Sequence, residues 1–309
     1  MARAVGILEF RDNDFTRSVA AGLAGMPVEY IKAGQLVHPS PSPFRLIIDR
    51  VSFCDQFLRQ VMRYWSIGGT YVLNNPFFTL VLDKLSELHL YDALGIHHPR
   101  TVLIPSGKQS EETAELAAGP DWDAVAECVG FPCIIKPVDG YAWQDVFRAD
   151  NPSTLRGLYE SLRSRHTLIV QQLVSYRSYF RAFCVGQQDV FLCRWDPLPF
   201  DRGVYSVPTP DDVSAGLAQF IREKSAALNA GLGLDFNAVE WCVTPEGDPL
   251  VIDSYNDVPD VRREKLPPEC YDWAVDRFCA CVREKVASDE CNASLPRFQP
   301  VSDAGARPC

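Results

Sequence analysis

Phe236-Asn237-Ala238-Val239-Glu240-Trp241, followed after a short gap by Leu250-Val251-Ile252-Asp253-Ser254-Tyr255-Asn256, is the stretch that decides the fold. Both runs are apolar and rich in β-branched and aromatic residues, which favours strands. Between them lies Thr244-Pro245-Glu246-Gly247-Asp248, whose Pro, Gly and Asp are typical of a tight turn. The stretch therefore predicts a β-hairpin that carries an acidic residue on each strand.

The register of this hairpin brings the two carboxylates together. A loop of two residues (Glu246-Gly247) or of four (Pro245 to Asp248) gives the same pairing, in which Glu240 lies opposite Asp253. Opposed side chains on one face are about 4.5–5.5 Å apart at Cβ, and like charges there repel each other. The pair either holds a hard cation such as Mg²⁺, Mn²⁺ or Ca²⁺, or is an incidental acidic pair on a surface hairpin. The hairpin alone leaves both interpretations open.

Composition restricts the classes of function. The chain has 309 residues, 47% of them hydrophobic and 23% charged, which is typical of a soluble globular protein of one to three domains. Its net charge of −10 argues against bulk electrostatic binding to nucleic acid or anionic membrane. No apolar run approaches the roughly 20 residues of a transmembrane helix. The eleven cysteines include no Cys-x-x-Cys, and several lie in apolar runs, so we expect buried thiols in a reducing cytoplasm.

Alternating elements predict the architecture of the first 75 residues. Strand-like Ala4–Leu8 precedes a helical pattern from Phe15 to Leu23, and strand-like Leu46–Asp49 precedes an amphipathic segment from Gln56 to Trp65. Tyr71–Asn75 is again strand-like and ends at a proline. This alternation predicts a small parallel α/β domain. No Gly-x-Gly-x-x-Gly follows the first strand, so a dinucleotide site is not indicated.

Four basic residues stand out because of the elements that carry them. Lys136 ends an apolar strand, and burying an ammonium group costs several kcal/mol unless the charge is paired. It is either paired or extended to the sheet edge. Lys84, taken alone, is an ordinary surface lysine. Arg181 and Arg194 fall on neighbouring strands of a second predicted hairpin, where both facing inward would form a cluster suited to phosphate or carboxylate.

Seven short stretches in a fixed order resemble the ATP-grasp superfamily, and in particular its ribosomal-modification-like carboxylate–amine ligases. They are Asp83-Lys84-Leu85, Gly95-Ile96 to Pro99-Arg100-Thr101, Ile134-Ile135-Lys136-Pro137, Val170-Gln171-Gln172-Leu173-Val174, Phe180-Arg181 to Gly186, Val239-Glu240, and Ile252-Asp253 to Asn256. None is diagnostic alone. The resemblance covers roughly residues 70 to 265, and it rests on their shared order and spacing.

The resemblance implies a mixed α/β and α+β fold, an ATP-grasp domain preceded by a small parallel α/β domain. Residues 1–75 would form that N-terminal domain. Residues 76–287 would form the ATP-grasp domain, with a lid-like subdomain at about 100–175 and a catalytic subdomain at about 176–287. Residues 288–309, polar and Pro-bearing, would be a disordered tail.

The family's site residues also carry over as implications. Lys84 and Lys136 would hold the phosphates of ATP, and Gln171, Gln172, Leu173 and Val174 would line the adenine. Arg181 and Arg194 would be catalytic, stabilising phosphate or an acyl intermediate. Glu240, Asp253 and Asn256 would bind Mg²⁺ or Mn²⁺.

Two departures from the family pattern bear on these implications. The loop after Lys136 normally carries several glycines whose amides cover the phosphates, and here Asp139–Trp143 has only one. The family usually has one residue between the last acidic ligand and the asparagine, whereas Ser254 and Tyr255 both intervene here. Side chains alternate along a strand, so Asn256 can face the same side as Asp253 only if the strand bulges or ends before it. Asp257, four residues after Asp253, is an alternative ligand.

We therefore expect an ATP-dependent ligase that activates a carboxylate as an acyl phosphate and joins it to an amine of an amino acid or small peptide. An ATP-grasp kinase for a small hydroxylated substrate and a non-catalytic nucleotide-binding module are the alternatives. The expected partners are small-molecule carboxylate and amine substrates, with neither nucleic acid nor membrane. Similar ligases often dimerise, but no stretch here indicates an interface.

Overall fold

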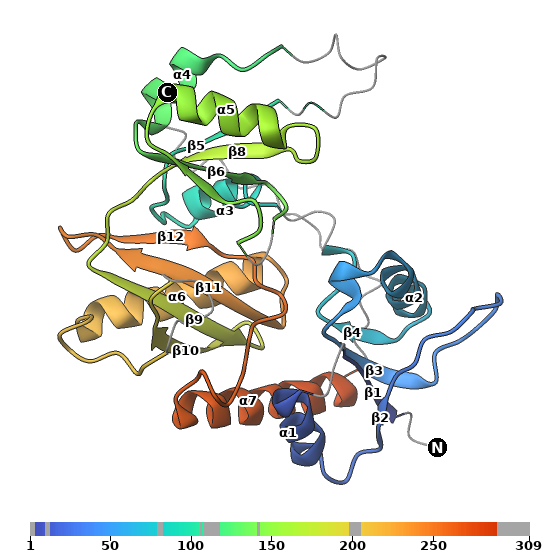
Figure 1. Ribbon diagram of the computed structural model, residues 1–309. Coiled ribbons are helices and arrows are strands. Elements are labelled where there is room, and N and C mark those ends of the chain that lie inside the picture. Colours follow the sequence, from blue (N-terminus) through green and yellow to red (C-terminus); the bar gives the residue numbers. More distant parts are fainter. Residues whose placement is uncertain are drawn as a thin grey trace.

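The computed structural model describes residues 4–9, 13–78, 83–105, 107, 118–140, 143–197 and 205–288. Three four-stranded sheets follow one another along the chain, and helices cover each of them (Figure 1). The predicted tail from residue 289 and part of the predicted phosphate loop, Tyr141-Ala142, lie outside the described residues. Within the described ranges, no helix is long and apolar enough to cross a membrane.

The N-terminal sheet is parallel, as the alternating pattern predicts. Its strands, in the spatial order β2-β1-β3-β4, are β1 (Ala4–Leu8), β2 (Val28–Tyr30), β3 (Phe44–Asp49) and β4 (Tyr71–Leu73). On one face lies α2 (Gln56–Ile67), which follows the short 3-10 helix η1 (Ser52–Cys54) and packs through Val61, Met62 and Trp65. On the other face lies α1 (Asp14–Gly22), which begins where the Asn13 side chain accepts a hydrogen bond from Phe15 N.

The second sheet is antiparallel and forms a separate small layer. Its strands, in the order β5-β8-β6-β7, are β5 (Thr101–Ile104), β6 (Cys133–Pro137), β7 (Phe147–Ala149) and β8 (Leu168–Gln172). Two helices, α4 (Trp122–Val129) and α5 (Pro152–Leu162), cover one face through a shared apolar cluster. The sequence analysis missed α4 and β7. Asp121 could have indicated α4, because its carboxylate accepts hydrogen bonds from the amides of Asp123 and Ala124 at the helix start.

The third sheet carries the hairpin that decides the fold. Its strands, in the order β10-β9-β11-β12, are β9 (Ser178–Val185), β10 (Asp189–Arg194), β11 (Phe236–Val243) and β12 (Pro249–Asp253). One face packs against α3 (Glu87–Ala93) and α6 (Ala215–Gly231), where the indole of Trp241 donates to Ser225 Oγ at 2.8 Å. The other face is covered by α7 (Pro268–Ala287), and every residue of β11 is buried.

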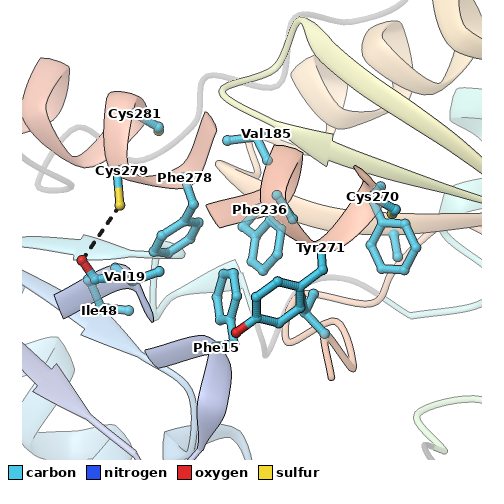
Figure 2. Packing of buried hydrophobic residues seen from close by; sticks show 14 of the residues in the cluster. Phe15, Val19, Ile48, Val185, Phe236, Cys270, Tyr271, Phe278, Cys279 and Cys281 are labelled. Carbon is cyan, nitrogen blue, oxygen red and sulfur yellow. Dashed lines mark hydrogen bonds between the residues drawn. The ribbon is translucent and has the colours of Figure 1, made fainter. Parts of the chain in front are cut away.

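The last helix joins the third sheet to the first domain. α7 lies against α1 below the third sheet (Figure 1). Figure 2 shows Phe278 of α7 beside both Phe15 of α1 and Phe236 of β11, with its ring centroid 5.3 and 4.9 Å from theirs. Burying such a phenylalanine contributes about 1.5–3 kcal/mol. The parallel domain and the C-terminal helix therefore share one core.

A bulge sets the pairing of the two carboxylates. Val243 pairs with Pro249, one residue out of the predicted register, so neither predicted loop length is right. The register then shifts at Ile252, which has no partner, and Glu240 pairs with Asp253 as predicted. Without the bulge, the strand alternation would turn Asp253 to the opposite face. The bulge thus compensates for the different turn and places both carboxylates on one face.

Candidate active site

Each carboxylate of the Glu240–Asp253 pair has a cation of its own. Glu240 accepts from the Arg181 guanidinium, its cross-strand neighbour on β9, and from Tyr179 Oη at 2.8 Å. Asp253 accepts from Lys84 Nζ at 2.5 Å and from its own strand's Tyr255 N at 3.2 Å. Burial would raise the pKa of Asp253, but Lys84 and Lys136 outweigh it and hold that pKa below its usual value. The repulsion between the two carboxylates is thereby offset within the chain.

Lys84 comes from the segment that enters α3, a helix drawn between the second and third sheets in Figure 1. The surface interpretation of this lysine is wrong, because its side chain is mostly buried and bonded to Asp253. Burial lowers the pKa of Lys84, yet Asp253 and Glu87 raise it more, so the net shift is upward. The ammonium group is charged and directed at the carboxylate pair.

Lys136 reaches the same neighbourhood from the second sheet. It is buried at the end of β6, and its Nζ donates to Gln171 Oε1 on β8 at 2.9 Å. Gln171 is held in turn by donating to Thr101 Oγ1 at 3.1 Å. Burial, and then repulsion by Lys84, lowers the pKa of Lys136 to about 8, against the attraction of Asp253 and Glu240. Lys84 before α3 and Lys136 on the second sheet therefore both attract the same two carboxylates.

Arg181 and Arg194 do not share a face. Arg181 lies opposite Cys193, so Arg194, the next residue, points to the other side of β10 and bonds the half-buried loop residue Asp212 at 3.0 Å. The Arg194 side chain is 51% exposed, against 12% for Arg181. The position facing Arg181 is taken by an aromatic ring instead: the guanidinium lies 4.1 Å from the Trp195 centroid and donates to Tyr205 Oη at 2.7 Å. The predicted two-arginine cluster does not form.

Asn256 and Asp257 point to different places. Asn256 folds back onto β11, where its Nδ2 donates to Ala238 O at 2.9 Å and its backbone amide to Asn237 Oδ1 at 2.8 Å. Its Oδ1 carries no hydrogen bond from the described residues and remains available as an acceptor. Asp257 accepts from Tyr255 Oη at 3.1 Å and lines a separate pocket beside Asp49.

The four residues predicted to line the adenine lie at the end of β8. Gln171 faces Lys136, whereas Gln172 pairs with Arg100 just before β5: its backbone N–H donates to Arg100 O at 2.8 Å, and its side-chain Oε1 accepts from Arg100 N at 3.4 Å. Leu173 is 36% exposed, and Val174 packs against the core of the third sheet. The strand end thus leaves one apolar side chain exposed.

Sequence analysis missed a buried carboxylate behind the site. Glu87 is 2% exposed, and its Oε2 accepts from Tyr91 Oη and from Ser254 Oγ, each at 2.7 Å. Burial, followed by repulsion from Asp253, raises the pKa of Glu87 to about 7, although Lys84 opposes the shift. The signal was present in the spacing, because Glu87 follows Lys84 by one helical turn and precedes Tyr91 by another.

The donor set fits ATP and a hard divalent cation. Carboxylate oxygens accept more than one contact, so Glu240 and Asp253 keep acceptor capacity beside their present partners, and Asn256 Oδ1 adds a third oxygen. Oxygen ligands of this kind suit Mg²⁺. Lys84 and Lys136 supply the positive charge that a triphosphate needs. Among the described residues, no three His, Cys, Asp or Glu side chains form a metal cluster by themselves, so a cation here would also need amide, water or phosphate ligands.

Comparison with known proteins bears on the fold. No protein-family model matches the chain, and no curated protein matches it in sequence. Among solved structures, a RimK-domain ATP-grasp protein from Sphaerobacter thermophilus matches with a TM-score of 0.64 at 19% identity, over 92% of this chain and 100% of that one. D-alanine–D-alanine ligase from Bacillus anthracis, solved with ATP, matches with a TM-score of 0.66 at 14% identity over 92% and 97%. The macrocyclase MdnC from Microcystis aeruginosa, solved with its precursor peptide MdnA, matches with 0.63 at 16% over 91% and 100%.

These likenesses establish that the chain has the ATP-grasp fold. They confirm the fold class that the seven sequence stretches imply. At identities of this size they establish the fold alone.

Proposed function

We propose that the protein is an ATP- and Mg²⁺-dependent ligase that activates a carboxylate as an acyl phosphate and joins it to an amine. The observation that carries this proposal is the convergence of Lys84, Lys136, Glu240 and Asp253 from three separate parts of the chain. Lys84 Nζ bonds Asp253, Asp253 pairs with Glu240 across the hairpin, and the charges of Lys84 and of both carboxylates act on the pKa of Lys136. Burying four charges has a large desolvation cost, so a purely structural role would be an expensive arrangement.

The chain's own groups divide the work of phosphoryl transfer. Lys84 and Lys136 would bind the phosphates, with Gln171 holding Lys136 in position. Glu240, Asp253 and Asn256 would hold the cation, which when bound neutralises charge that builds up on the phosphate oxygens. Arg181 would fix the orientation of Glu240 through the guanidinium contact. No protein nucleophile is required, because the substrate carboxylate attacks the phosphate itself.

The class of substrate follows from the neighbours more than from this chain. Of the similar solved structures, MdnC was solved with a precursor peptide, and the Bacillus anthracis enzyme is named a D-alanine–D-alanine ligase. An amino acid or a peptide as the carboxylate, and an amino group as its acceptor, is therefore the substrate pair that we propose.

Release of ADP tests the proposal. Purified protein with ATP and MgCl₂ is screened over pairs of amino acids and short peptides, with ADP and phosphate followed separately. Hydroxylamine in place of the amine traps an acyl phosphate as a hydroxamate. ADP release that needs both a carboxylate and an amine, together with hydroxamate formation, supports a ligase.

Two other outcomes overturn it. ADP release with a hydroxylated substrate and no hydroxamate would make the protein a kinase. Saturable ATP binding without turnover over the whole screen would make it a nucleotide-binding module. Lys32→Ala is the matched control for loss of a lysine, because Lys32 is exposed in the N-terminal domain.

A further inference from the structure

Glu87, behind the Glu240–Asp253 pair, has one carboxylate oxygen without a partner. Its Oε2 accepts from Tyr91 Oη and from Ser254 Oγ, each at 2.7 Å. Its Oε1 is buried and receives no hydrogen bond from the residues that the structure describes. A buried acceptor without a donor is rare in folded proteins, because the oxygen has lost its hydration without compensation. The unused oxygen therefore indicates a donor that reaches it in another state of the protein.

Two hydroxyl groups fix the direction of this oxygen. Tyr91 follows Glu87 by one turn of α3, and Ser254 is the residue after β12. Tyr91 Oη also lies 2.8 Å from Ser254 Oγ, so each of the three polar groups contacts the other two. All three side chains are buried. The Glu87 carboxylate is thus held in one orientation, and Oε1 points to one place.

Lys84 is the cation within reach of this oxygen. Glu87 follows Lys84 by three residues, and Glu87 N donates to Asp83 O at 3.3 Å, so the backbone between them already turns as in a helix. Side chains at this spacing lie about 5–6 Å apart at Cβ. Burial lowers the pKa of Lys84, whereas the charges of Asp253 and then of Glu87 raise it, which agrees with this proximity. The structure describes no ion pair between Lys84 and Glu87, because the ammonium group bonds Asp253 instead, at 2.5 Å.

A divalent cation at Asp253 would compete with Lys84 for the same carboxylate. Lys84 Nζ donates to Oδ2 of Asp253, and Oδ1 accepts from Tyr255 N at 3.2 Å. A cation on either oxygen would lie close to the ammonium group, and like charges at short separation repel strongly where water is largely excluded. Glu240 is not a substitute acceptor, because Arg181 already holds it and the cation would bind it too. Once the cation is bound, Lys84 needs a second carboxylate oxygen.

We propose that Glu87 is a positioning residue that accepts Lys84 when a divalent cation displaces the lysine from Asp253. The ammonium group moves from Asp253 Oδ2 to Glu87 Oε1, and only these hydrogen bonds change. An ammonium group has three N–H donors, so Lys84 keeps two of them for the phosphates of a nucleotide while Glu87 holds it in place. The identity of the cation as the one that serves the ligase rests on the proposed function, whereas the exchange needs only a divalent cation at Asp253.

Binding of MnCl₂ to the whole protein without nucleotide tests the exchange. The electron paramagnetic resonance signal of free Mn²⁺ decreases on binding, and circular dichroism checks the fold of each variant. Glu87→Gln keeps an oxygen that accepts from the two hydroxyls, and it should weaken Mn²⁺ binding at least tenfold, because Lys84 then leaves Asp253 without a charged acceptor. Asp92→Asn removes an exposed carboxylate from the same helix and should stay within twofold of the wild type.

A second background separates the exchange from a structural role of Glu87. Lys84→Met removes the competing ammonium group, so this variant should bind Mn²⁺ at least as tightly as the wild type. In that background Glu87→Gln should change the affinity by less than twofold, since no lysine remains to be accepted. Glu87→Asp is the second variant at this position. It keeps the charge but withdraws the oxygens by one methylene group, and it should give a smaller loss that also disappears with Lys84→Met.

Each remaining outcome overturns the inference. An equal loss of Mn²⁺ affinity for Glu87→Gln in both backgrounds would make Glu87 a structural or general electrostatic group. An unchanged affinity in Glu87→Gln, or weaker binding in Lys84→Met, would mean that Lys84 and the cation do not exchange. These results leave the proposed function standing, because the hydroxamate assay on the same samples tests it separately. If the wild type binds no Mn²⁺ saturably, both the inference and the proposed cation site fail.

Discussion

The two acidic pairs of this molecule are surrounded differently. At the Glu240–Asp253 pair each carboxylate has its own cation, Arg181 for one and Lys84 for the other. Neither Asp49 nor Asp257 forms an ion pair with a described residue, although the charge of Arg50 attracts both carboxylates. A pair that is balanced internally can be buried permanently, whereas an unbalanced pair is stable only if its protons, water or a ligand offset the repulsion.

The difference bears on how each pair responds to loss of a charge. At the Glu240–Asp253 pair, the attraction of Arg181 and Lys84 offsets the repulsion between the carboxylates, so nucleotide and cation would have to redistribute contacts that already exist. The Asp49–Asp257 pair has no ion pair to lose among the described residues. We therefore expect the Glu240–Asp253 pair to respond strongly to loss of any one charge, and the Asp49–Asp257 pair to become more stable when a charge is removed.

The largest effect is expected for the lysine from the second sheet. Lys136→Ala should lower ATP-dependent turnover by about a thousandfold, about 4 kcal/mol, because a phosphate would lose its ammonium partner in a site of low polarity. Asp253→Asn should do the same by removing a cation ligand. The coupled assay for ADP measures both, and circular dichroism checks that the fold is intact. Turnover at the wild-type rate in either variant would falsify the assignment.

Breaking the balanced pair tests the comparison itself. Arg181→Met should lower the free energy of unfolding by about 3 kcal/mol, because Glu240, 9% exposed, is left buried without its cation. Urea unfolding gives the value. The double variant Arg181→Met/Glu240→Gln should recover part of the loss, since it no longer buries a charge. If the double variant is as unstable as the two single losses added together, the Arg181–Glu240 contact is not what stabilises this region.

The unbalanced pair should appear in the pH dependence of stability. Because the folded-state pKa of Asp257 is about 6, above the ordinary value of 3.8, the folded protein binds more protons than the unfolded chain between these values, and stability falls as pH rises from 4 to 7. After allowance for partial exposure of Asp257, the effect is about 2 kcal/mol. Asp257→Asn should flatten this part of the profile and be at least as stable as wild type at pH 7.

Urea unfolding at a series of pH values measures that profile. Glu87, whose folded-state pKa is about 7, contributes a decrease of the same sign that extends to higher pH. Asp253 acts in the opposite direction, because its lowered pKa makes stability fall as pH drops. Glu87→Gln is therefore the control that separates the two raised groups. An unchanged slope in Asp257→Asn between pH 4 and 6 would mean that Asp257 is not charged in an unfavourable environment.

Much of this architecture was predictable because it depends on local patterns. Alternating apolar runs predicted the parallel sheet, and the hairpin pattern brought Glu240 opposite Asp253. The predicted pairing of Glu240 with Asp253 is correct, but the predicted turn is not. The register at the turn differs by one residue, and the bulge at Ile252 restores the pairing. Neither the turn geometry nor the bulge has a sequence signature strong enough to predict both.

The parts that could not be predicted depend on which face a side chain takes. Nothing in the sequence around Lys84 shows that Asp253, 169 positions away, will bind and help to bury it. Glu87 and Tyr91 lie at helical spacing from Lys84, but only Ser254, the residue after β12, makes them a network. Asp257 looked like an alternative to Asn256, because in an extended chain it lies on the side of Asp253. The bend after β12 instead turns it toward Asp49.

The smallest effect is expected for substitution of Arg194, in contrast to Arg181. Arg194→Ala should change the free energy of unfolding by less than about 1 kcal/mol, because the Arg194 end of its ion pair with Asp212 is half exposed to solvent. The apparent affinity for ATP and MgCl₂, measured by the midpoint shift, should stay within about twofold, since nothing in this arrangement brings the Arg194 side chain to Glu240 or Lys136. Arg181→Lys, which keeps the charge but loses the flat contact with Trp195, is the matched variant and should weaken that affinity more. A larger loss of ATP affinity in Arg194→Ala than in Arg181→Lys would mean that β10 rotates when nucleotide binds. Arg194 would then contact the nucleotide, as the family resemblance implies.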